Sequence, residues 1–168
     1  MKIFLIGFMG CGKSTLGKKL AAKLACAFID LDHEIELIAE STVGDYFAAH
    51  GEEVFRQLES DTLKNHVYPA NCVIATGGGT PCYFDNMDWM NEHGTTVYIK
   101  MTPVSLARRL ENGRAKRPLL KDLSADGVVH FIENKLQERE TFYNRAALKL
   151  SGVNLTAELI RSKLQHED

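Results

Sequence analysis

Residues 7–14 combine glycines, a lysine and a serine in the pattern of a phosphate-binding loop. They read GFMGCGKS, which fits the motif G-x-x-x-x-G-K-[ST]. Glycines permit positive φ, so successive backbone N–H groups can turn inward around an anion at the start of a helix. Lys13 would reach the β- and γ-phosphates of a nucleoside triphosphate, and the Ser14 hydroxyl would ligate Mg²⁺. The segment therefore predicts a nucleotide site; the alternative is a glycine-rich turn with a chance KS pair.

Two carboxylates, Asp30 and Asp32, follow a short apolar run at 27–29. In an extended chain, side chains two residues apart point to the same side. Both acids would then leave the carboxyl end of a strand, where ligands bind in open α/β sheets. One could support Mg²⁺, and the other could accept a hydrogen bond from a substrate hydroxyl. The alternative is an N-cap for a helix starting near residue 33, and the two roles are compatible.

Two further patterns could bind an anion. Arg56 and Glu59 share one face of a helix predicted over about 52–66, and by themselves they indicate an ion pair exposed to solvent. The segment 76–81 reads TGGGTP directly after an apolar run at 72–75. Three glycines cost backbone entropy, so we expect them to let a ligand approach bare backbone N–H groups. A flexible linker is the alternative.

The segment 108–121 holds six basic residues and one acidic residue. Its portion from 112 to 121 contains glycine and proline and is predicted to be a long loop. Guanidinium groups on such a loop could close over a triphosphate, exclude water and neutralise charge in the transition state. Surface charge exposed to solvent is the alternative.

Short apolar runs separated by helical patterns give the order of elements that would position these residues. The runs at 2–6, 27–29, 72–75, 95–101 and 148–150 are predicted strands. Helical patterns lie between them, including a long one over about 125–147 and a closing one that reaches residue 164. The sequence predicts an α/β fold, a three-layer α/β/α P-loop sandwich around a five-stranded parallel sheet with right-handed crossovers.

Composition limits the class of protein. A chain of 168 residues with 45% hydrophobic content is expected to form a single domain, 1–168. A net charge of −2 disfavours a general nucleic-acid binder. The four cysteines form no C-x-x-C pair, so neither a disulfide framework nor a zinc site is predicted. The first apolar run is too short for a membrane span and lacks a cleavage site. We expect a cytoplasmic monomer that binds neither nucleic acid nor membrane.

Taken together, the motifs resemble those of shikimate kinases. They are GFMGCGKST at 7–15, DLD at 30–32, FRxxE at 55–59, TGGG at 76–79, RPLL at 117–120 and Arg139 before Tyr143. The resemblance implies a nucleoside-monophosphate-kinase-like fold. It also implies ATP-dependent phosphorylation of the shikimate 3-hydroxyl, on the route to chorismate and the aromatic amino acids.

The resemblance assigns the acceptor site to a helical region at about 32–66 and to the TGGG segment. Arg56 and Arg139 would clamp the substrate carboxylate beside the backbone N–H groups of Gly78 and Gly79. Asp32 would hold the hydroxyls and orient or deprotonate the attacking one. Paired guanidinium groups suit a carboxylate, and an aspartate suits a hydroxyl.

The resemblance also assigns the nucleotide side, with a lid at about 112–124. Asp30 would help Ser14 to hold Mg²⁺ through water, and Lys13, Asp32 and Arg117 would be catalytic. An arginine before the lid would pack on adenine, and Arg108 and Arg109 both remain candidates. The residues that would bind ATP are Gly10, Cys11, Gly12, Lys13, Ser14, Thr15 and Arg117.

Two other functions remain to be discriminated. A related small-molecule kinase such as a gluconate kinase would share the loop, the fold and the lid, but would not need an arginine pair beside a triple-glycine turn. A non-catalytic ATP-binding regulatory module would not need Lys13, Ser14, Asp32 and Arg117 together.

Overall fold

A five-stranded parallel sheet forms the centre of the protein. The computed structural model describes residues 1–114, 117 and 119–166. The strand order is β2-β3-β1-β4-β5, and every neighbouring pair is parallel. The strands are β1 (Lys2–Ile6), β2 (Ala27–Asp30), β3 (Cys72–Ala75), β4 (Thr95–Lys100) and β5 (Leu148–Ser151). The phosphate-loop strand β1 lies in the middle of the sheet, between β3 and β4.

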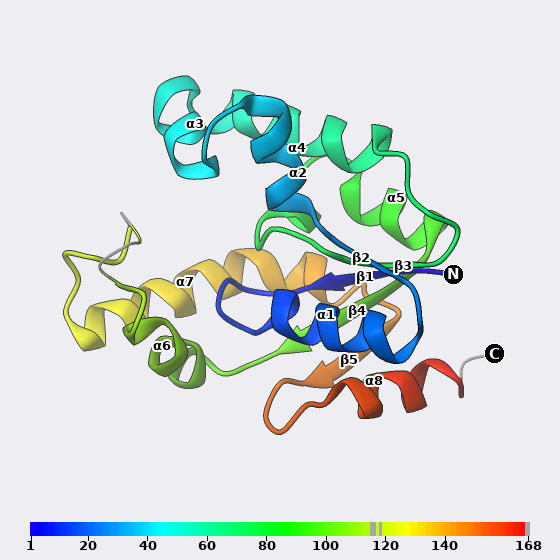
Figure 1. Cartoon of the computed structure of the whole chain (residues 1–168). Coiled ribbons are helices and arrows are strands. Elements are labelled where there is room, and N and C mark those ends of the chain that lie inside the picture. The colour runs from blue at the N-terminus through cyan, green and yellow to red at the C-terminus, as the bar shows by residue number, and fades with distance from the viewer. Residues whose placement is uncertain (115–116, 118, 167–168) are drawn as a thin grey trace.

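Helices cover both faces of this sheet (Figure 1). Before β4 they are α1 (Lys13–Lys23), α2 (Leu31–Ala39), α3 (Val43–His50), α4 (Glu52–Asn65), the 3₁₀ turn η1 (Thr80–Cys82) and α5 (Asn86–His93). After β4 they are α6 (Pro103–Glu111), α7 (Ala125–Tyr143) and α8 (Ala157–Leu164). Helices α2, α3 and α4 contact one another and form a group at one side of the molecule.

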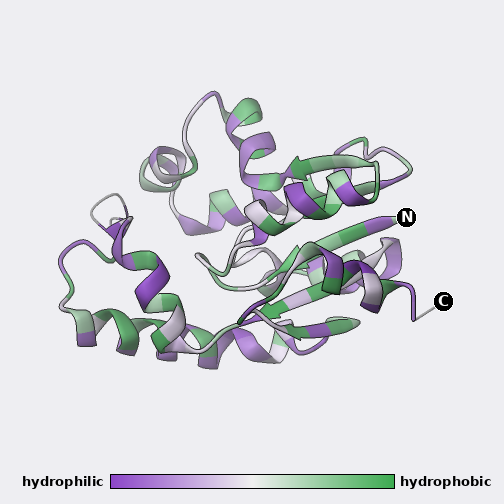
Figure 2. Ribbon diagram, turned by 60° about the horizontal axis from the view of Figure 1, so that its bottom comes forward, coloured by the Kyte–Doolittle hydropathy of each residue, from purple (hydrophilic) through white to green (hydrophobic). Residues whose placement is uncertain are grey.

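Two hydrophobic clusters, one on each side of the sheet, hold the layers together. One cluster joins Leu5 and Val73 to Leu20 of α1 and Ile160 of α8. The other includes Phe4, Ile74 and Tyr98 with Ile132 and Tyr143 of α7. Hydrophobic residues are accordingly concentrated in the strands and on the inner faces of the helices (Figure 2). Apolar runs without polar alternation form these strands because helices bury both of their faces.

Side-chain caps fix the starts of several helices. Thr42, Thr102 and Ser124 each accept a hydrogen bond from the backbone N–H three residues later. Such caps satisfy amide groups that have no partner within the helix. Asp30 caps α2 in the same way, by accepting a hydrogen bond from the backbone N–H of Asp32 at 3.1 Å.

The predicted three-layer α/β/α sandwich with five parallel strands is confirmed. Two local expectations were wrong. The chain does not stay extended through Asp32, because α2 begins at Leu31 and Asp32 lies in its first turn. The long helix ends at Tyr143 rather than near residue 147, because a turn over 144–147 leads the chain into β5 and buries Ala146. Among the described residues, no helix combines the length and apolarity needed to cross a membrane.

Candidate active site

Most of the predicted phosphate-loop and aspartate residues line a cavity of about 420 Å³ at the carboxyl ends of β1, β2 and β3. Three predicted acceptor-site residues, Arg56, Gly79 and Arg139, do not line it. The lining residues are Met9, Gly10, Gly12, Lys13, Ser14, Thr15, Asp30, Asp32, Thr76, Gly77, Gly78, Arg109 and Arg117. A larger hollow of about 680 Å³ lies where β4 and β5 end against α7, and none of the predicted site residues lines it. We therefore place the site in the smaller cavity, which the phosphate loop and the two aspartates line.

The phosphate loop has the backbone that its glycines predict. Gly7, Gly10 and Gly12 have φ of 146°, 81° and 96°. The Lys13 Nζ donates to the carbonyl oxygens of Gly7 at 2.7 Å and Phe8 at 3.0 Å. The third donor of the ammonium group faces Sγ of Cys11 at 3.7 Å. A thiol sulfur is a weak acceptor, so an anion in the loop could replace this contact.

Cys11, which was predicted to bind the nucleotide, does not line the cavity. The residue is only 1% exposed and belongs to the core beneath the loop. Its backbone N–H donates to the Phe8 carbonyl at 3.2 Å, which closes the turn inside the loop. The residue thus shapes the loop from below.

Ser14 and Asp30 bring two oxygen groups together at the mouth of the loop. The Ser14 hydroxyl donates to Oδ2 of Asp30 at 2.7 Å, while Oδ1 of Asp30 caps α2. Within the part of the chain that the structure describes, no group of three or more His, Cys, Asp or Glu side chains could hold a metal ion. A hydroxyl and one carboxylate fit a cation such as Mg²⁺, which keeps several water ligands and takes others from phosphates.

Asp32 is half-buried beside these groups. Burial, together with the negative charges of Glu59 and Asp30, raises the pKa of its carboxyl to about 6 against the opposing effect of Lys13. A carboxyl that titrates near neutrality can accept a proton from a bound hydroxyl. This is the role that the resemblance implies for Asp32.

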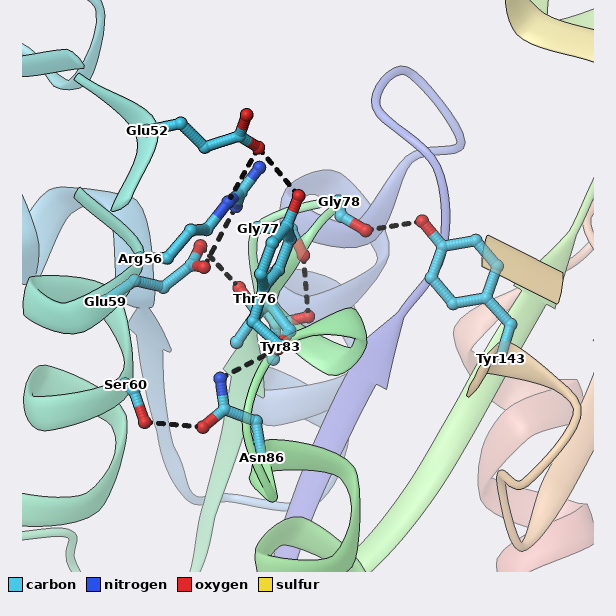
Figure 3. Close-up of polar contacts among 11 residues, drawn as sticks. Glu52, Arg56, Glu59, Ser60, Thr76, Gly77, Gly78, Tyr83, Asn86 and Tyr143 are labelled. Atoms are coloured by element: carbon cyan, nitrogen blue, oxygen red, sulfur yellow. Dashed lines mark hydrogen bonds and ion pairs between the residues drawn. The ribbon is translucent and has the colours of Figure 1, made fainter. Parts of the chain in front are cut away.

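Arg56 and Glu59 form a buried ion pair, so the expectation of a solvated pair was wrong. Glu59 is 1% exposed and Arg56 9%. The Arg56 Nη1 donates to Oε1 of Glu59 at 3.0 Å (Figure 3). The Thr80 hydroxyl donates to Oε2 of Glu59 at 2.8 Å. Both carboxylate oxygens of Glu59 are therefore occupied, and the guanidinium is held in one place.

The triple-glycine turn makes room for these charged side chains. A Cβ at Gly79 would lie 2.6 Å from both terminal nitrogens of Arg56. A Cβ at Gly77 would lie 3.0 Å from Oε2 of Glu59 and 3.1 Å from Oδ1 of Asp32. None of the three glycines has the positive φ that would itself require glycine. They are needed because protein side chains occupy the space.

Arg139 reaches the same turn from the opposite side. A Cβ at Gly78 would lie 3.3 Å from Nη1 of Arg139, whose guanidinium also lies over the Phe8 ring at 5.5 Å. One helical turn later, the buried Tyr143 donates its hydroxyl to the Gly78 carbonyl (Figure 3). Helices α4 and α7 thus bring Arg56 and Arg139 to adjacent glycines.

Arg108 and Arg109, the two candidates for packing on adenine, lie in different environments. The Arg109 Nε donates to the Gly10 carbonyl at 2.8 Å, so this side chain lies against the phosphate loop. Arg108 instead lines a small hollow between α6 and α7. From the predicted lid, Arg117 lies 3.8 Å from Sδ of Met9, whereas residues 115, 116 and 118 lie outside the described residues.

Sequence reasoning did not assign a role to Thr80, Tyr83 or Glu52. Thr80 holds Glu59, and Tyr83 donates its hydroxyl to Glu52 at 2.6 Å above Arg56. Thr80 and Tyr83 lie in the irregular segment around η1, where no periodicity indicates which way a side chain points. Glu52 reads as an ordinary acidic residue in the first turn of a helix.

The chain matches known proteins along nearly its whole length. The shikimate kinase family model matches residues 9–167. A curated shikimate kinase from Azobacteroides pseudotrichonymphae genomovar. CFP2 is 49% identical over 148 residues, which cover 88% of this chain and 87% of that protein. The crystal structure of shikimate kinase from Bacteroides thetaiotaomicron superposes with a TM-score of 0.91 at 41% identity, covering 99% of this chain and 97% of that one.

A second similar structure is a complex with a ligand. Shikimate kinase from Acinetobacter baumannii in complex with shikimate superposes with a TM-score of 0.83 at 32% identity, covering 98% of this chain and 90% of that one. A gluconokinase from Sinorhizobium meliloti 1021 superposes with a TM-score of only 0.60 at 15% identity, covering 98% and 89%. The likeness to the gluconokinase shows a shared fold alone.

Proposed function

The chain belongs to the shikimate kinase family, and we propose that it transfers the γ-phosphoryl group of ATP to the 3-hydroxyl of shikimate, releasing shikimate 3-phosphate and ADP. The observation that carries this proposal is the meeting of Arg56 and Arg139 at Gly79 and Gly78, beside Asp32. Asp32 lines the cavity, and the two guanidinium groups meet at the glycine turn that forms part of its wall. This arrangement suits a small acceptor with a carboxylate at one end and a hydroxyl at the other.

The nucleotide half of the reaction rests on the phosphate loop. Backbone N–H groups of residues 10–15 would bind the phosphates, and Lys13 would stay with the charge as it moves to the transferred group. Ser14 and Asp30 would hold Mg²⁺, which when bound with ATP neutralises phosphate charge and orients the leaving group. Arg109 would pack on the nucleotide, since it already lies against Gly10.

Binding of the phosphoryl acceptor depends on charged side chains that the protein holds in place before the substrate binds. Glu59 holds Arg56, so the guanidinium loses little further freedom on binding a carboxylate. Asp32 would accept a hydrogen bond from the attacking hydroxyl and take its proton as the bond to phosphorus forms. Because Asp32 lies against Gly77 and Arg56 against Gly79 of the same turn, binding the carboxylate also orients the hydroxyl.

The wider assignments follow from this mechanism. Residues 32–66 form the acceptor side, and residues 112–124 form a lid from which Arg117 reaches the cavity. Arg117 would stabilise charge on the transferred group and exclude water. We place the enzyme in the cytoplasm as a monomer, without nucleic-acid or membrane partners. The four free thiols and the net charge of −2 support this placement.

A coupled assay of ADP release with Mg²⁺ and ATP tests the proposed function. We expect turnover with shikimate and none above background with gluconate or without an acceptor. Arg56→Lys should raise the KM for shikimate by about tenfold or more and leave the KM for ATP unchanged, because lysine cannot donate in a bidentate fashion. Arg145→Lys is the matched control, since Arg145 pairs with Asp88 away from the cavity. Turnover of gluconate at a comparable rate, or an unchanged KM in Arg56→Lys, would contradict the proposal.

A further inference from the structure

Arg56 keeps part of its donor capacity free. Its Nη1 pairs with Glu59, but its buried Nε has no hydrogen-bond partner in the described part of the chain. Oε1 of Glu52 forms a long ion pair with this nitrogen, at 3.6 Å. This separation is too long for a hydrogen bond. A modest movement of the Glu52 carboxylate would nevertheless bring it into contact.

The carboxylate of Glu52 is also bound by Tyr83. The Tyr83 hydroxyl donates to Oε1 of Glu52 at 2.6 Å, and this is the same oxygen that faces Arg56 (Figure 3). The Tyr83 ring covers the guanidinium, with Cζ of Arg56 4.2 Å from the ring centroid. The hydrogen bond from Tyr83 also lowers the pKa of Glu52. Glu52 is therefore a carboxylate, and more than half of its side chain is exposed and able to move.

Two anions then compete for one edge of Arg56. A guanidinium binds a carboxylate best through two parallel N–H donors, and Glu59 already uses Nη1. A substrate carboxylate that uses Nε must reach the donor which Glu52 also faces. The long ion pair between Glu52 and Nε leaves that edge accessible, whereas a hydrogen bond between them would have to break before the edge could bind the substrate.

We propose that Tyr83 is a positioning residue that restrains Glu52 and so keeps the Nε edge of Arg56 open for the carboxylate of the phosphoryl acceptor. The proposal rests on the proposed function for the identity of that acceptor. It assigns the ring and the hydroxyl of Tyr83 separate roles. The ring packs on the cation, and the hydroxyl occupies the oxygen that would otherwise close on Arg56.

Tyr83→Phe separates these roles, because it keeps the ring and removes only the hydroxyl. We expect the KM and Kd for shikimate to rise by about 1.5-fold to fivefold, because a partly exposed ion pair that competes with the substrate contributes an amount in that range. The kcat and the KM for ATP should stay within about twofold. Adding Glu52→Gln should restore shikimate affinity, since an amide does not compete as an anion. Tyr68→Phe is the matched control: it removes a hydroxyl that donates to the Leu63 carbonyl, away from Arg56.

A readout without substrate tests the restraint itself. In Tyr83→Phe, a crystal structure should show Glu52 within about 3 Å of Nε of Arg56, and the Nε–H resonance should exchange more slowly than in the wild type. Glu52→Gln should reverse both changes. If Glu52 stays where it is, or if Glu52→Gln alone weakens shikimate binding as Tyr83→Phe does, the proposal is wrong. A wild-type protein that fails to phosphorylate shikimate would overturn the proposed function instead, and the position of Glu52 would still decide the role of Tyr83.

Discussion

Gly79→Ala isolates the effect of a single methyl group on Arg56. Gly79 has φ of −92° and ψ of −10°, which alanine adopts without strain. The new Cβ would lie 2.6 Å from Nη1 and Nη2 of Arg56 and 2.8 Å from its Cζ. Ordinary contacts need about 3.5 Å or more, so the guanidinium or the turn must shift by roughly 1 Å.

The guanidinium has little room for such a shift. Glu59 holds it at 3.0 Å, and the Tyr83 ring covers it at 4.2 Å. A misplacement of about 1 Å at a binding group can cost about 10²-fold in rate, which corresponds to about 2.7 kcal/mol. We therefore expect kcat/KM for shikimate to fall by about 10²-fold, chiefly through KM. The KM for ATP should change by less than about twofold, because the phosphate loop keeps its own backbone.

Steady-state kinetics with each substrate varied in turn, together with urea unfolding, will measure both effects. Gly44→Ala is the matched control, since no atom lies within 4 Å of the added Cβ and Gly44 lies within α3. It should leave the kinetics unchanged and raise the free energy of unfolding by about 0.5–1 kcal/mol. If Gly79→Ala binds shikimate as the wild type does while Arg56→Lys binds it poorly, the guanidinium relocates freely and the steric reasoning fails.

Two further outcomes concern chemistry and pH. Lys13→Ala should lower kcat by about 10²-fold or more with shikimate binding by calorimetry retained, because Lys13 acts on charge that moves during transfer; a loss below tenfold would contradict this role. The pKa of Asp32 is raised to about 6 by burial and by neighbouring acids, so kcat/KM for shikimate should rise with pH through about 6. The same shift means that the folded state binds this proton more tightly than the unfolded state, so its contribution to stability is present below about pH 4 and is lost as pH rises through about 6. Asp32→Asn should therefore gain up to about 3 kcal/mol over the wild type between pH 4 and pH 7.5 in urea unfolding, and a difference that does not depend on pH would refute the assignment.

The strands and the phosphate loop were predictable because their signals are local. A buried parallel strand needs a continuous apolar run, and β1 and β3 are such runs between polar turns. The loop needs glycine wherever φ is positive, and Gly7, Gly10 and Gly12 meet that need. In both cases the sequence near a residue decides its structure.

The buried ion pair was not predictable, because its cause lies elsewhere in the sequence. Arg56 and Glu59 have the spacing of any surface pair on a helix. They are buried because Gly79 leaves space for the guanidinium and Thr80 donates to Glu59, both from a turn some 20 residues later. The start of α2 at Leu31 was missed for another reason. Asp30 can end a strand and cap a helix equally well, and only the folded chain shows that it does both.

The choice between Arg108 and Arg109 shows the same limit. Neighbouring residues on a helix point about 100° apart, so only one of the two can reach the phosphate loop. The sequence of α6 does not reveal which one, since both are basic and both lie near its end. The packing of α6 against α7 turns Arg108 toward α7, and this leaves Arg109 to meet Gly10.

The carboxylate clamp and the base are electrically linked through Glu59. Glu59 raises the pKa of Asp32, and both carboxylates lie about 3 Å from the position of a Cβ at Gly77. Arg56 neutralises part of the Glu59 charge through its hydrogen bond at 3.0 Å. Moving Arg56 away would therefore expose Asp32 to more of that charge and raise its pKa further. Gly79→Ala should then shift the acid limb of the pH profile of kcat/KM to higher pH, whereas Gly44→Ala should not. If both variants kept the wild-type limb while Gly79→Ala lost shikimate affinity, Arg56 would act on the substrate alone and the linkage through Glu59 would be disproved.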